Sequence, residues 1–334
     1  MPELPDLASV LADLHVVALP LRTRFRGIDV REVALVRGPA GWGEFAPFTE
    51  YDDAESAPWL AAGLEAAWWG FPAALRDHVA VNATVPAVRP EQVAAVLDQF
   101  PGCTVAKVKV ADGPLADDLA RVAAVRAAGL GVRVDANGLW SVDEATAALR
   151  ALAEQGPLEY AEQPCASVEE LAAVRAAGTG VRIAADESIR KASDPLRVVR
   201  AGAADVAVLK VPPLGGVRRV LSLAAELDTL GVPVVISSGL DSAVGMAAGL
   251  AAAAAVPGEA LACGLATGGL LAADVTADVR PVGGVLAVGA VVPEQERLTA
   301  LAAPADRRAW WEQRLRRAHA LLAAGHPSWP PPGG

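Results

Sequence analysis

Cysteine is scarce in this chain, with three residues among 334. Cys103, Cys165 and Cys263 lie too far apart for the paired spacing of a zinc site, and an odd, sparse count does not fit a disulfide framework. The cysteines therefore indicate a reducing compartment and small buried side chains.

Histidine is nearly as rare, and none of the four residues ends one of the strands predicted below. They are His15, His78, His319 and His326. We therefore expect no histidine to act as a catalytic base or metal ligand. The sequence also lacks a serine triad, a phosphate-binding Walker loop and the glycine-rich dinucleotide fingerprint, which argues against the enzyme classes built on them.

Positive charge is in deficit, because 29 Lys and Arg residues face 39 Asp and Glu residues, for a net charge of -10. This balance disfavours nucleic acid and anionic membranes as partners. An anionic small-molecule substrate remains compatible, since a bound divalent ion and nearby lysines would reverse the local field. The most apolar segment, 243–256, is too short and too rich in alanine to span a membrane. The acidic start, Met1–Asp6, lacks the basic segment of a signal peptide, so a cytoplasmic location is expected.

From about Val79 the chain alternates β-branched runs with alanine-rich helical stretches, which is typical of βα units. An interval near 25 residues accommodates one strand, one helix and two short loops. The predicted strands are Val81–Val85, Val105–Val110, Val132–Asp135, Leu158–Glu162, Arg182–Asp186, Val206–Lys210, Val234–Ser237 and Leu261–Gly264. Eight such strands predict an α/β fold with a (β/α) barrel.

The residues before the barrel do not follow this rhythm. Val10–Pro20 and Asp29–Val36 are predicted strands and Ala57–Trp69 a predicted helix, so residues 1–78 are expected to form an α+β segment. The barrel would span residues 79–292. Residues 293–334, which contain a basic helix at Asp306–Ala324, are expected to return to the N-terminal segment.

Three carboxylates stand at the ends of successive predicted strands. Asp135, Glu162 and Asp186 each close a short apolar run, and they are 27 and 24 residues apart. Because a parallel barrel gathers the C-terminal ends of its strands around one cavity, these side chains are expected to meet there. A helix cap or a surface ion pair would be the ordinary explanation for a single acid, but three in register favour a shared site.

This set offers only oxygen ligands, with no histidine or cysteine in the adjoining positions. Three carboxylates suit Mg²⁺, with Mn²⁺ as a substitute, and disfavour zinc. Such an ion would leave positions for water and for a substrate carboxylate.

Lysines precede and follow the carboxylates along the barrel. Lys107 and Lys109 alternate on one strand, so both can point into the barrel, and Lys210 ends the sixth strand across the cavity. Repulsion between two ammonium groups, partial burial and a nearby metal ion all lower the pKa of a lysine and favour a base near neutral pH. Solvated surface lysines are the alternative, which the register disfavours.

Weaker signals adjoin these positions. Asn137 and Glu187 could support the ligands, or could be an ordinary turn residue and a solvated acid. Small residues after the seventh and eighth strands could hold an anionic substrate, or could form plain turns: Ser237, Ser238, Gly239 and Gly264. Three arginines near the start could reach an anionic tail, although a solvated basic loop is the safer interpretation: Arg22, Arg24 and Arg26.

As a set, these motifs resemble those of the enolase superfamily, and within it the muconate-lactonising subgroup. The matching segments are Lys107-Val108-Lys109, Asp135-Ala136-Asn137, Glu162-Gln163-Pro164, Asp186-Glu187-Ser188 and Lys210. The resemblance implies a modified (β/α)7β barrel with an N-terminal α+β capping domain. It also implies a divalent ion that stabilises an enediolate, formed when a lysine removes a proton next to a carboxylate.

Flanking segments are most similar to those of the actinobacterial dehydratases of this subgroup, which form o-succinylbenzoate for menaquinone biosynthesis. These segments are Tyr160–Cys165, Ile183–Ser188, Val234–Leu240, Ala262–Thr267 and Gly41–Phe48. The resemblance implies that Lys109 is first the base and then the acid on one face. It also implies that Lys107 keeps Lys109 partly neutral, and that Lys210 holds the substrate ring by a cation–π contact.

Other activities of the superfamily remain alternatives. Racemisation of N-succinylamino or N-acylamino acids, or epimerisation of dipeptides, needs a base on each face, which Lys109 and Lys210 could supply. Residues 262–268 contain no acid to hold a substrate amine, which disfavours dipeptides. A catalytically silent barrel is disfavoured because all five polar strand-end residues are present. The sequence leaves the oligomeric state open.

Overall fold

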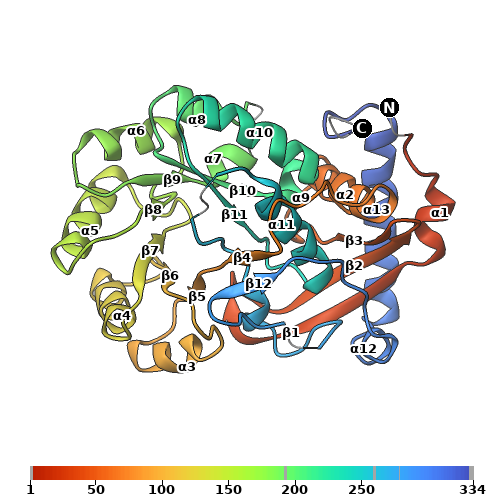
Figure 1. The fold of residues 1–334 in the computed structure, drawn as a ribbon, viewed down its shortest axis with the longest axis horizontal. Helices are drawn as coiled ribbons and strands as arrows, with labels where there is room; N and C mark the ends of the chain where they lie inside the picture. Colours follow the sequence, from red (N-terminus) through yellow and green to blue (C-terminus); the bar gives the residue numbers. More distant parts are fainter. Residues whose placement is uncertain (1–2, 192–193, 259–260, 278, 331–334) are drawn as a thin grey trace.

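The computed structural model describes residues 3–191, 194–258, 261–277 and 279–330, which form a barrel of parallel strands with an antiparallel sheet beside it (Figure 1). Within these ranges, every helix is too short or too polar to cross a membrane. The observed α/β architecture confirms the predicted fold class.

Residues 15–68 lie beside the barrel, and we call them the cap. They form a sheet of β1 (His15–Phe25), β2 (Ile28–Gly38) and β3 (Gly41–Phe45), and helix α2 (Asp53–Trp68) packs closely on this sheet. Two glycines permit this approach, because a Cβ on Gly43 would lie 1.9 Å from the carbonyl oxygen of Gly63.

The strand predicted from Val10 is wrong at its start. Residues 7–12 form helix α1 (Leu7–Ala12) instead, and β1 begins only at His15. The Asp6 carboxylate accepts a hydrogen bond from the backbone N–H of Ser9, which caps the helix and satisfies one of its free N–H groups.

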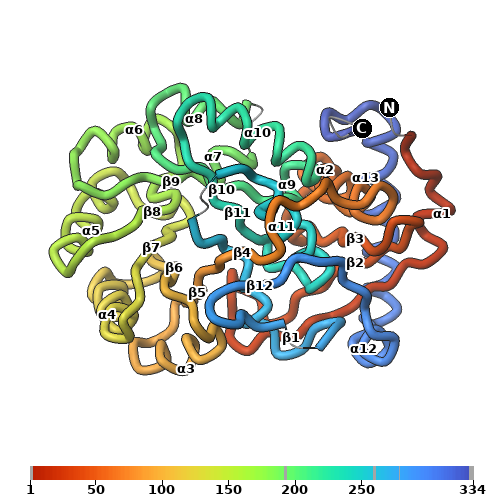
Figure 2. Tube along the Cα trace, in the orientation of Figure 1, coloured from red at the N-terminus to blue at the C-terminus, as the bar shows by residue number. Residues whose placement is uncertain are grey.

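The chain returns to the cap at its C-terminal end. Helix α13 (Ala305–Ala323) lies against α2, and Figure 2 shows this blue segment beside the red N-terminal one. Arg314 of α13 is fully buried and donates hydrogen bonds to the carbonyl oxygens of Phe48 and Tyr51, both at 2.7 Å. These contacts join residues that are more than 260 positions apart in the sequence.

The barrel sheet has the strand order β11-β10-β9-β8-β7-β6-β5, with all neighbours parallel. Its strands are β5 (Ala83–Val85), β6 (Val105–Lys109), β7 (Gly131–Asp135), β8 (Ala161–Glu162), β9 (Ile183–Ala185), β10 (Val206–Lys210) and β11 (Val234–Ser237). Each strand overlaps one of the predicted runs.

The eighth predicted strand, Leu261–Gly264, is reduced to single bridges. Cys263 bridges Val81 and Gly264 bridges Ser237, both in parallel orientation. The Cys263 N–H donates to the Ala80 carbonyl, and the Gly264 N–H donates to the Ile236 carbonyl. This segment therefore links the two edges of the sheet and closes the barrel without being a regular strand.

The first predicted strand, Val81–Val85, is wrong in its first two residues. The chain changes partners there, because the Val81 N–H bonds to Gly284 and the Asn82 N–H bonds to Cys263. Upstream, β4 (His78–Ala80) pairs antiparallel with β12 (Val285–Ala287), outside the barrel.

Helices connect the barrel strands as predicted, and several begin at capping boxes such as Ser141 with Glu144 and Ser167 with Glu170. The connecting helices are η1 (Pro90–Gln92), α3 (Val93–Leu97), α4 (Leu115–Ala127), α5 (Val142–Glu154), α6 (Val168–Ala176), α7 (Glu187–Arg190), α8 (Arg197–Arg200), α9 (Val211–Leu214), α10 (Val217–Thr229) and α11 (Ala243–Ala255). Two further helices, η2 (Thr267–Leu270) and α12 (Gln295–Ala300), follow the last barrel segment.

Candidate active site

Parallel register brings the strand-end residues into one row. Lys109 is the neighbour of Asp135 across β6 and β7, and Asp135 is the neighbour of Glu162 across β7 and β8. Asp186 follows β9 directly, and Lys210 is the last residue of β10. Tyr160 and Val208, which stand two residues before Glu162 and Lys210, belong to a buried apolar cluster beneath this row.

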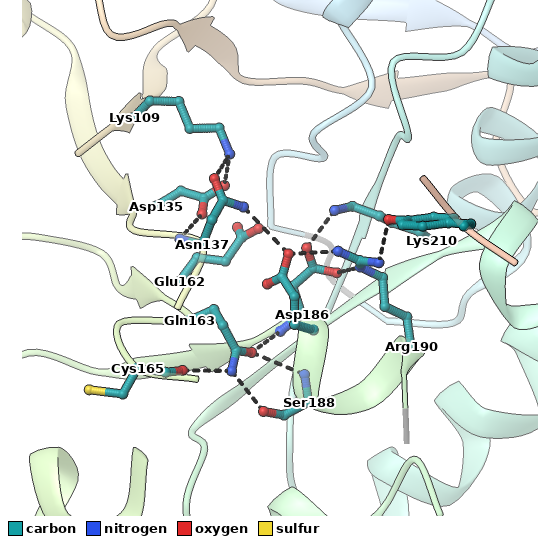
Figure 3. Close-up of polar contacts among 12 residues, drawn as sticks. Lys109, Asp135, Asn137, Glu162, Gln163, Cys165, Asp186, Ser188, Arg190 and Lys210 are labelled. Carbon is teal, nitrogen blue, oxygen red and sulfur yellow. Dashed lines mark hydrogen bonds and ion pairs between the residues drawn. The ribbon is translucent and has the colours of Figure 1, made fainter. Parts of the chain in front are cut away.

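All three carboxylates are buried, with Asp135 and Glu162 each 1% exposed and Asp186 fully buried. Each is paired with a lysine. Lys107 Nζ lies 2.9 Å from Glu162 Oε1 and 3.1 Å from Asp135 Oδ2. Lys109 Nζ lies 2.6 Å from Asp135 Oδ2, and Lys210 Nζ lies 2.5 Å from Asp186 Oδ2 (Figure 3). Three of the four lysines in the chain thus converge on these acids.

The two lysines of β6 have different surroundings, which shift their pKa values in opposite directions. Burial disfavours the charged form of Lys107, but the charges of Glu162 and Asp135 outweigh this effect and hold its pKa well above the ordinary value. For Lys109, burial and the charge of Lys107 prevail over the attraction of Asp135, so its pKa is lowered. The structure therefore makes Lys109 the better proton acceptor of the two.

The three acids crowd one another. Burial and the charges of Asp135 and Asp186 raise the pKa of Glu162 to about 7. Burial also opposes ionisation of Asp135, but Lys109 and Lys107 outweigh it and lower its pKa. Lys210 and Arg190 likewise overcome burial and lower the pKa of Asp186 to about 2. Carboxylates that repel one another in a buried site are the arrangement that a divalent cation relieves.

The three acids form ion pairs with lysines and are not yet arranged around a single metal position. Among the described residues, no three side chains of Asp, Glu, His or Cys already lie close enough to share one ion. The donor set still fits a hard cation, because it is buried, contains only oxygen and comes from three adjacent strands. Glu187 adds a buried carboxylate oxygen, Oε2, that has no hydrogen-bond partner.

Asn137 and Glu187 connect the two sides of the row. Asn137 Oδ1 accepts a hydrogen bond from Lys109 at 2.6 Å, and its amide nitrogen lies 3.4 Å from Glu187 Oε1. Glu187 in turn pairs with Arg190 at 2.7 Å. Arg190 also contacts Asp186 Oδ1 at 3.1 Å and donates to the Tyr51 hydroxyl at 3.0 Å, which ties the row to the cap.

Gln163 fixes the spacing between the ends of β8 and β9. Its side-chain oxygen accepts hydrogen bonds from the backbone N–H groups of Asp186 and Ser188, and its amide donates to the Ser188 hydroxyl at 2.7 Å (Figure 3). Gln163 is fully buried and has a positive φ of 40°. It thereby determines where Asp186 leaves its strand.

A pocket between barrel and cap brings most of the predicted site residues together. Its lining includes the three lysines, Asp135 and Asn137, together with Ser237, Ser238, Gly239 and Gly264. A wider cavity of about 700 Å³ adjoins it, and Lys109 and Asn137 line both. Glu162, Asp186 and Glu187 are not among the lining residues of this pocket.

Among the further residues that line the pocket, sequence reasoning missed Thr84, whereas it named Arg26 as a residue that could reach an anionic tail but preferred a solvated loop. Thr84 stands opposite Lys107 in register, and its buried hydroxyl has no hydrogen-bond partner. Thr267 pairs with Ser238 through their hydroxyls at 2.6 Å. Arg26 lines the pocket while its guanidinium stacks on Phe48, 4.2 Å from the ring centroid. The strand register could have indicated Thr84, whereas Arg26 depends on the folding of the cap.

The other two arginines near the start do not line this pocket. Arg24 is exposed, 3.8 Å from Asp29, and Arg22 lines a separate cavity near α11. All three arginines are exposed, as the solvated-loop interpretation expects, although Arg26 also lines the pocket and Arg24 lines the adjoining cavity.

Comparison with known proteins places this site in context. The chain matches the family models described as Enolase N-terminal domain-like, over residues 16–67, and Enolase C-terminal domain-like, over residues 90–294. The o-succinylbenzoate synthase of Mycolicibacterium smegmatis is 61% identical over 320 residues, which cover 95% of this chain and 98% of that protein.

Two further relatives support the comparison. The o-succinylbenzoate synthase of Mycobacterium tuberculosis (strain H37Rv) is 57% identical over 324 residues, covering 96% of this chain and 98% of that protein. Among solved structures, the muconate lactonizing enzyme from Pseudomonas fluorescens superposes with a TM-score of 0.74 at 22% identity, over 87% of this chain and 98% of that one. At 22% identity, this match shows that the two proteins share a fold.

Proposed function

Because this chain belongs to the enolase superfamily and, within it, to the o-succinylbenzoate synthases, we propose that it dehydrates 2-succinyl-6-hydroxy-2,4-cyclohexadiene-1-carboxylate to o-succinylbenzoate in menaquinone biosynthesis. The observation that carries the proposal is identity of 57–61% to curated synthases over nearly the whole chain. The scarcity of cysteine supports a cytoplasmic location for the reaction.

Asp135, Glu162 and Asp186 would hold Mg²⁺, or Mn²⁺ in its place, as their oxygen-only donor set and mutual repulsion favour. A bound ion supplies Lewis-acid stabilisation of the negative charge that develops on the substrate carboxylate. Asn137 and Glu187 support this set through their contacts with Lys109 and Arg190.

Lys109 is the proposed base. In its neutral form, Nζ takes the proton from the ring carbon that bears the carboxylate, and the electron pair of that C–H bond moves toward the carboxylate. The resulting ammonium then gives the same proton to the departing hydroxyl on the same face. The C–O bond breaks, water leaves, and the ring becomes aromatic.

Lys107 and Lys210 remain protonated in this scheme. Lys107 repels a second positive charge and so favours the neutral form of Lys109. Three strands, β7 to β9, separate β6 from β10, so Lys210 approaches the substrate from the opposite side. There its ammonium can hold the ring by a cation–π contact. Ser237, Ser238, Gly239 and Gly264 would line the remaining surface around the succinyl tail.

The test is direct. Purified protein with Mg²⁺ and the cyclohexadiene carboxylate should show the absorbance change of aromatisation, and EDTA should abolish it. Exchange of the α-proton of N-succinylamino acids in D₂O measures the racemase alternative on the same sample. Metal binding without dehydration, accompanied by α-proton exchange, would contradict the proposal and favour a racemase.

A further inference from the structure

A group of buried charges joins the cap to a loop that lines the pocket. This loop, residues 237–241, begins with the last residue of β11 and contributes Ser237, Ser238, Gly239 and Leu240 to the pocket lining. Leu240 has a positive φ of 63°, a conformation that non-glycine residues keep only where their surroundings impose it.

Arg31 of β2 provides the first connection. Its guanidinium is buried and donates to the carbonyl oxygens of Leu240 at 3.1 Å and Gly239 at 3.4 Å, and also to that of Ala46. Trp59 of α2 packs on the same loop, because a Cβ on Gly239 would lie 2.8 Å from its ring. The cap therefore fixes the backbone of the loop from two sides.

Glu44 of β3 provides the second connection, at the start of α11. One carboxylate oxygen, Oε2, accepts hydrogen bonds from the backbone N–H groups of Ser242 at 3.0 Å and Gly245 at 3.3 Å, and from the Ser242 hydroxyl. The other oxygen, Oε1, is buried and has no hydrogen-bond partner.

Asp241 lies beside the same glycine as Glu44 and also has one carboxylate oxygen without a hydrogen-bond partner. Its Oδ2 accepts the N–H of Gly239 at 3.1 Å, while Oδ1 is buried and has no partner. A Cβ on Gly245 would lie 2.7 Å from Glu44 Oε1 and 2.9 Å from Asp241 Cβ, so both acids lie against this glycine. Two buried carboxylates beside one another repel when both are ionised, and each here has an oxygen without a hydrogen-bond partner, so binding one proton removes the repulsion.

We infer that Glu44 is a positioning residue that is neutral in the folded protein, and that the carboxyl proton it shares with Asp241 fastens the substrate-lining loop 237–241 to the cap. The remaining negative charge is balanced by Arg31. The other charged or titratable groups that face this cluster are Arg26, Tyr51, Lys210 and Asp274.

The pH dependence of the free energy of unfolding follows from the direction in which folding shifts the pKa of Glu44. Burial and the charge of Asp241 raise the pKa of Glu44 from 4.5 to about 8. Between these values the folded protein keeps a proton that the unfolded chain has released, so wild-type stability falls as pH rises. A glutamine at position 44 is a neutral mimic of the protonated acid and removes this loss.

The experiment compares wild type with Glu44→Gln by urea unfolding between about pH 5.5 and pH 7.5. The ratio of the folding equilibrium constant of Glu44→Gln to that of wild type should increase about tenfold for each unit by which the pH rises. Glu32→Gln is the matched control, since Glu32 also lies on the cap sheet but pairs with Arg307 and has a lowered pKa. The difference in the free energy of unfolding between Glu32→Gln and wild type should be the same throughout this pH range.

A difference between Glu44→Gln and wild type that does not change with pH would overturn the inference, leaving Glu44 as an ionised helix cap. Should Glu44→Gln fail to fold, Asp241→Asn tests the same proton. The infrared difference spectrum of wild type minus Asp241→Asn must then show a carboxylic acid band near neutral pH, because Glu162, whose pKa is about 7, contributes equally to both proteins. Absence of that band would equally contradict the shared proton.

A kinetic measurement addresses the loop itself and rests on its proposed substrate contacts. Above about pH 8, the KM of wild type should rise as Glu44 ionises and the loop loosens, whereas the KM of Glu44→Gln should not. The pH dependence of kcat, set by Lys109, should be shared by both. The unfolding measurement does not depend on activity, so failure of the proposed reaction would not be confused with failure of this inference.

Discussion

Lys107 and Lys109 lie two residues apart on β6, yet their neighbours move their pKa values in opposite directions. Lys107 contacts two carboxylates, whereas Lys109 contacts one and is repelled by Lys107. Position relative to the acids, rather than residue type, therefore makes Lys109 easier to deprotonate than Lys107.

Replacing Lys109 by alanine should lower turnover at least about a hundredfold, because a positioned general base contributes at least that much. Mg²⁺ affinity should remain nearly unchanged, since Asp135, Glu162 and Asp186 are retained. Steady-state assays and calorimetric Mg²⁺ titration measure the two effects. Lys191→Ala is the matched control, because the fourth lysine lies over the ring of Tyr51, outside the pocket. Activity of Lys109→Ala above about a hundredth of wild type would contradict the role of Lys109.

At the scale of single elements, strand periodicity predicted the row of strand-end acids and lysines better than it predicted the strand boundaries. β8 contains only Ala161 and Glu162, although the apolar run suggested five residues, yet Glu162 still stands at the strand end. The eighth segment keeps its place through bridges alone. Arg190 and Tyr51 could not be predicted, because their contact spans 139 positions and depends on how the cap sits over the barrel.

The packing of α2 on β3 offers a test at the same scale. Gly43→Ala would place a methyl group 1.9 Å from the Gly63 carbonyl oxygen, so helix and strand must separate. We expect a loss of about 1–3 kcal/mol in the free energy of unfolding, as in other overpacked cores. Gly289→Ala is the control, because no atom lies within 4 Å of the added carbon and its φ is not positive. Denaturant unfolding of both variants measures the difference, and equal stability would contradict this account of the packing.

Across the whole molecule, the proposed metal ligands belong to different βα units of one closed sheet. Asp135 ends β7, Glu162 ends β8 and Asp186 follows β9, and each is buried by the barrel that surrounds it. An unfolded chain has no reason to hold these three side chains together. Any ion that binds all three must therefore bind the folded state preferentially and stabilise the whole protein.

Mg²⁺ at one hundred times its dissociation constant should raise the free energy of unfolding by about 2.7 kcal/mol. Glu162→Gln should lose most of this gain, because it replaces a charged ligand by an amide while keeping the size of the side chain. Urea unfolding with Mg²⁺, against NaCl at the same ionic strength, separates specific binding from screening. If Mg²⁺ stabilised Glu162→Gln as much as wild type, the ion would have to bind elsewhere, and the three carboxylates would serve only as partners of the lysines.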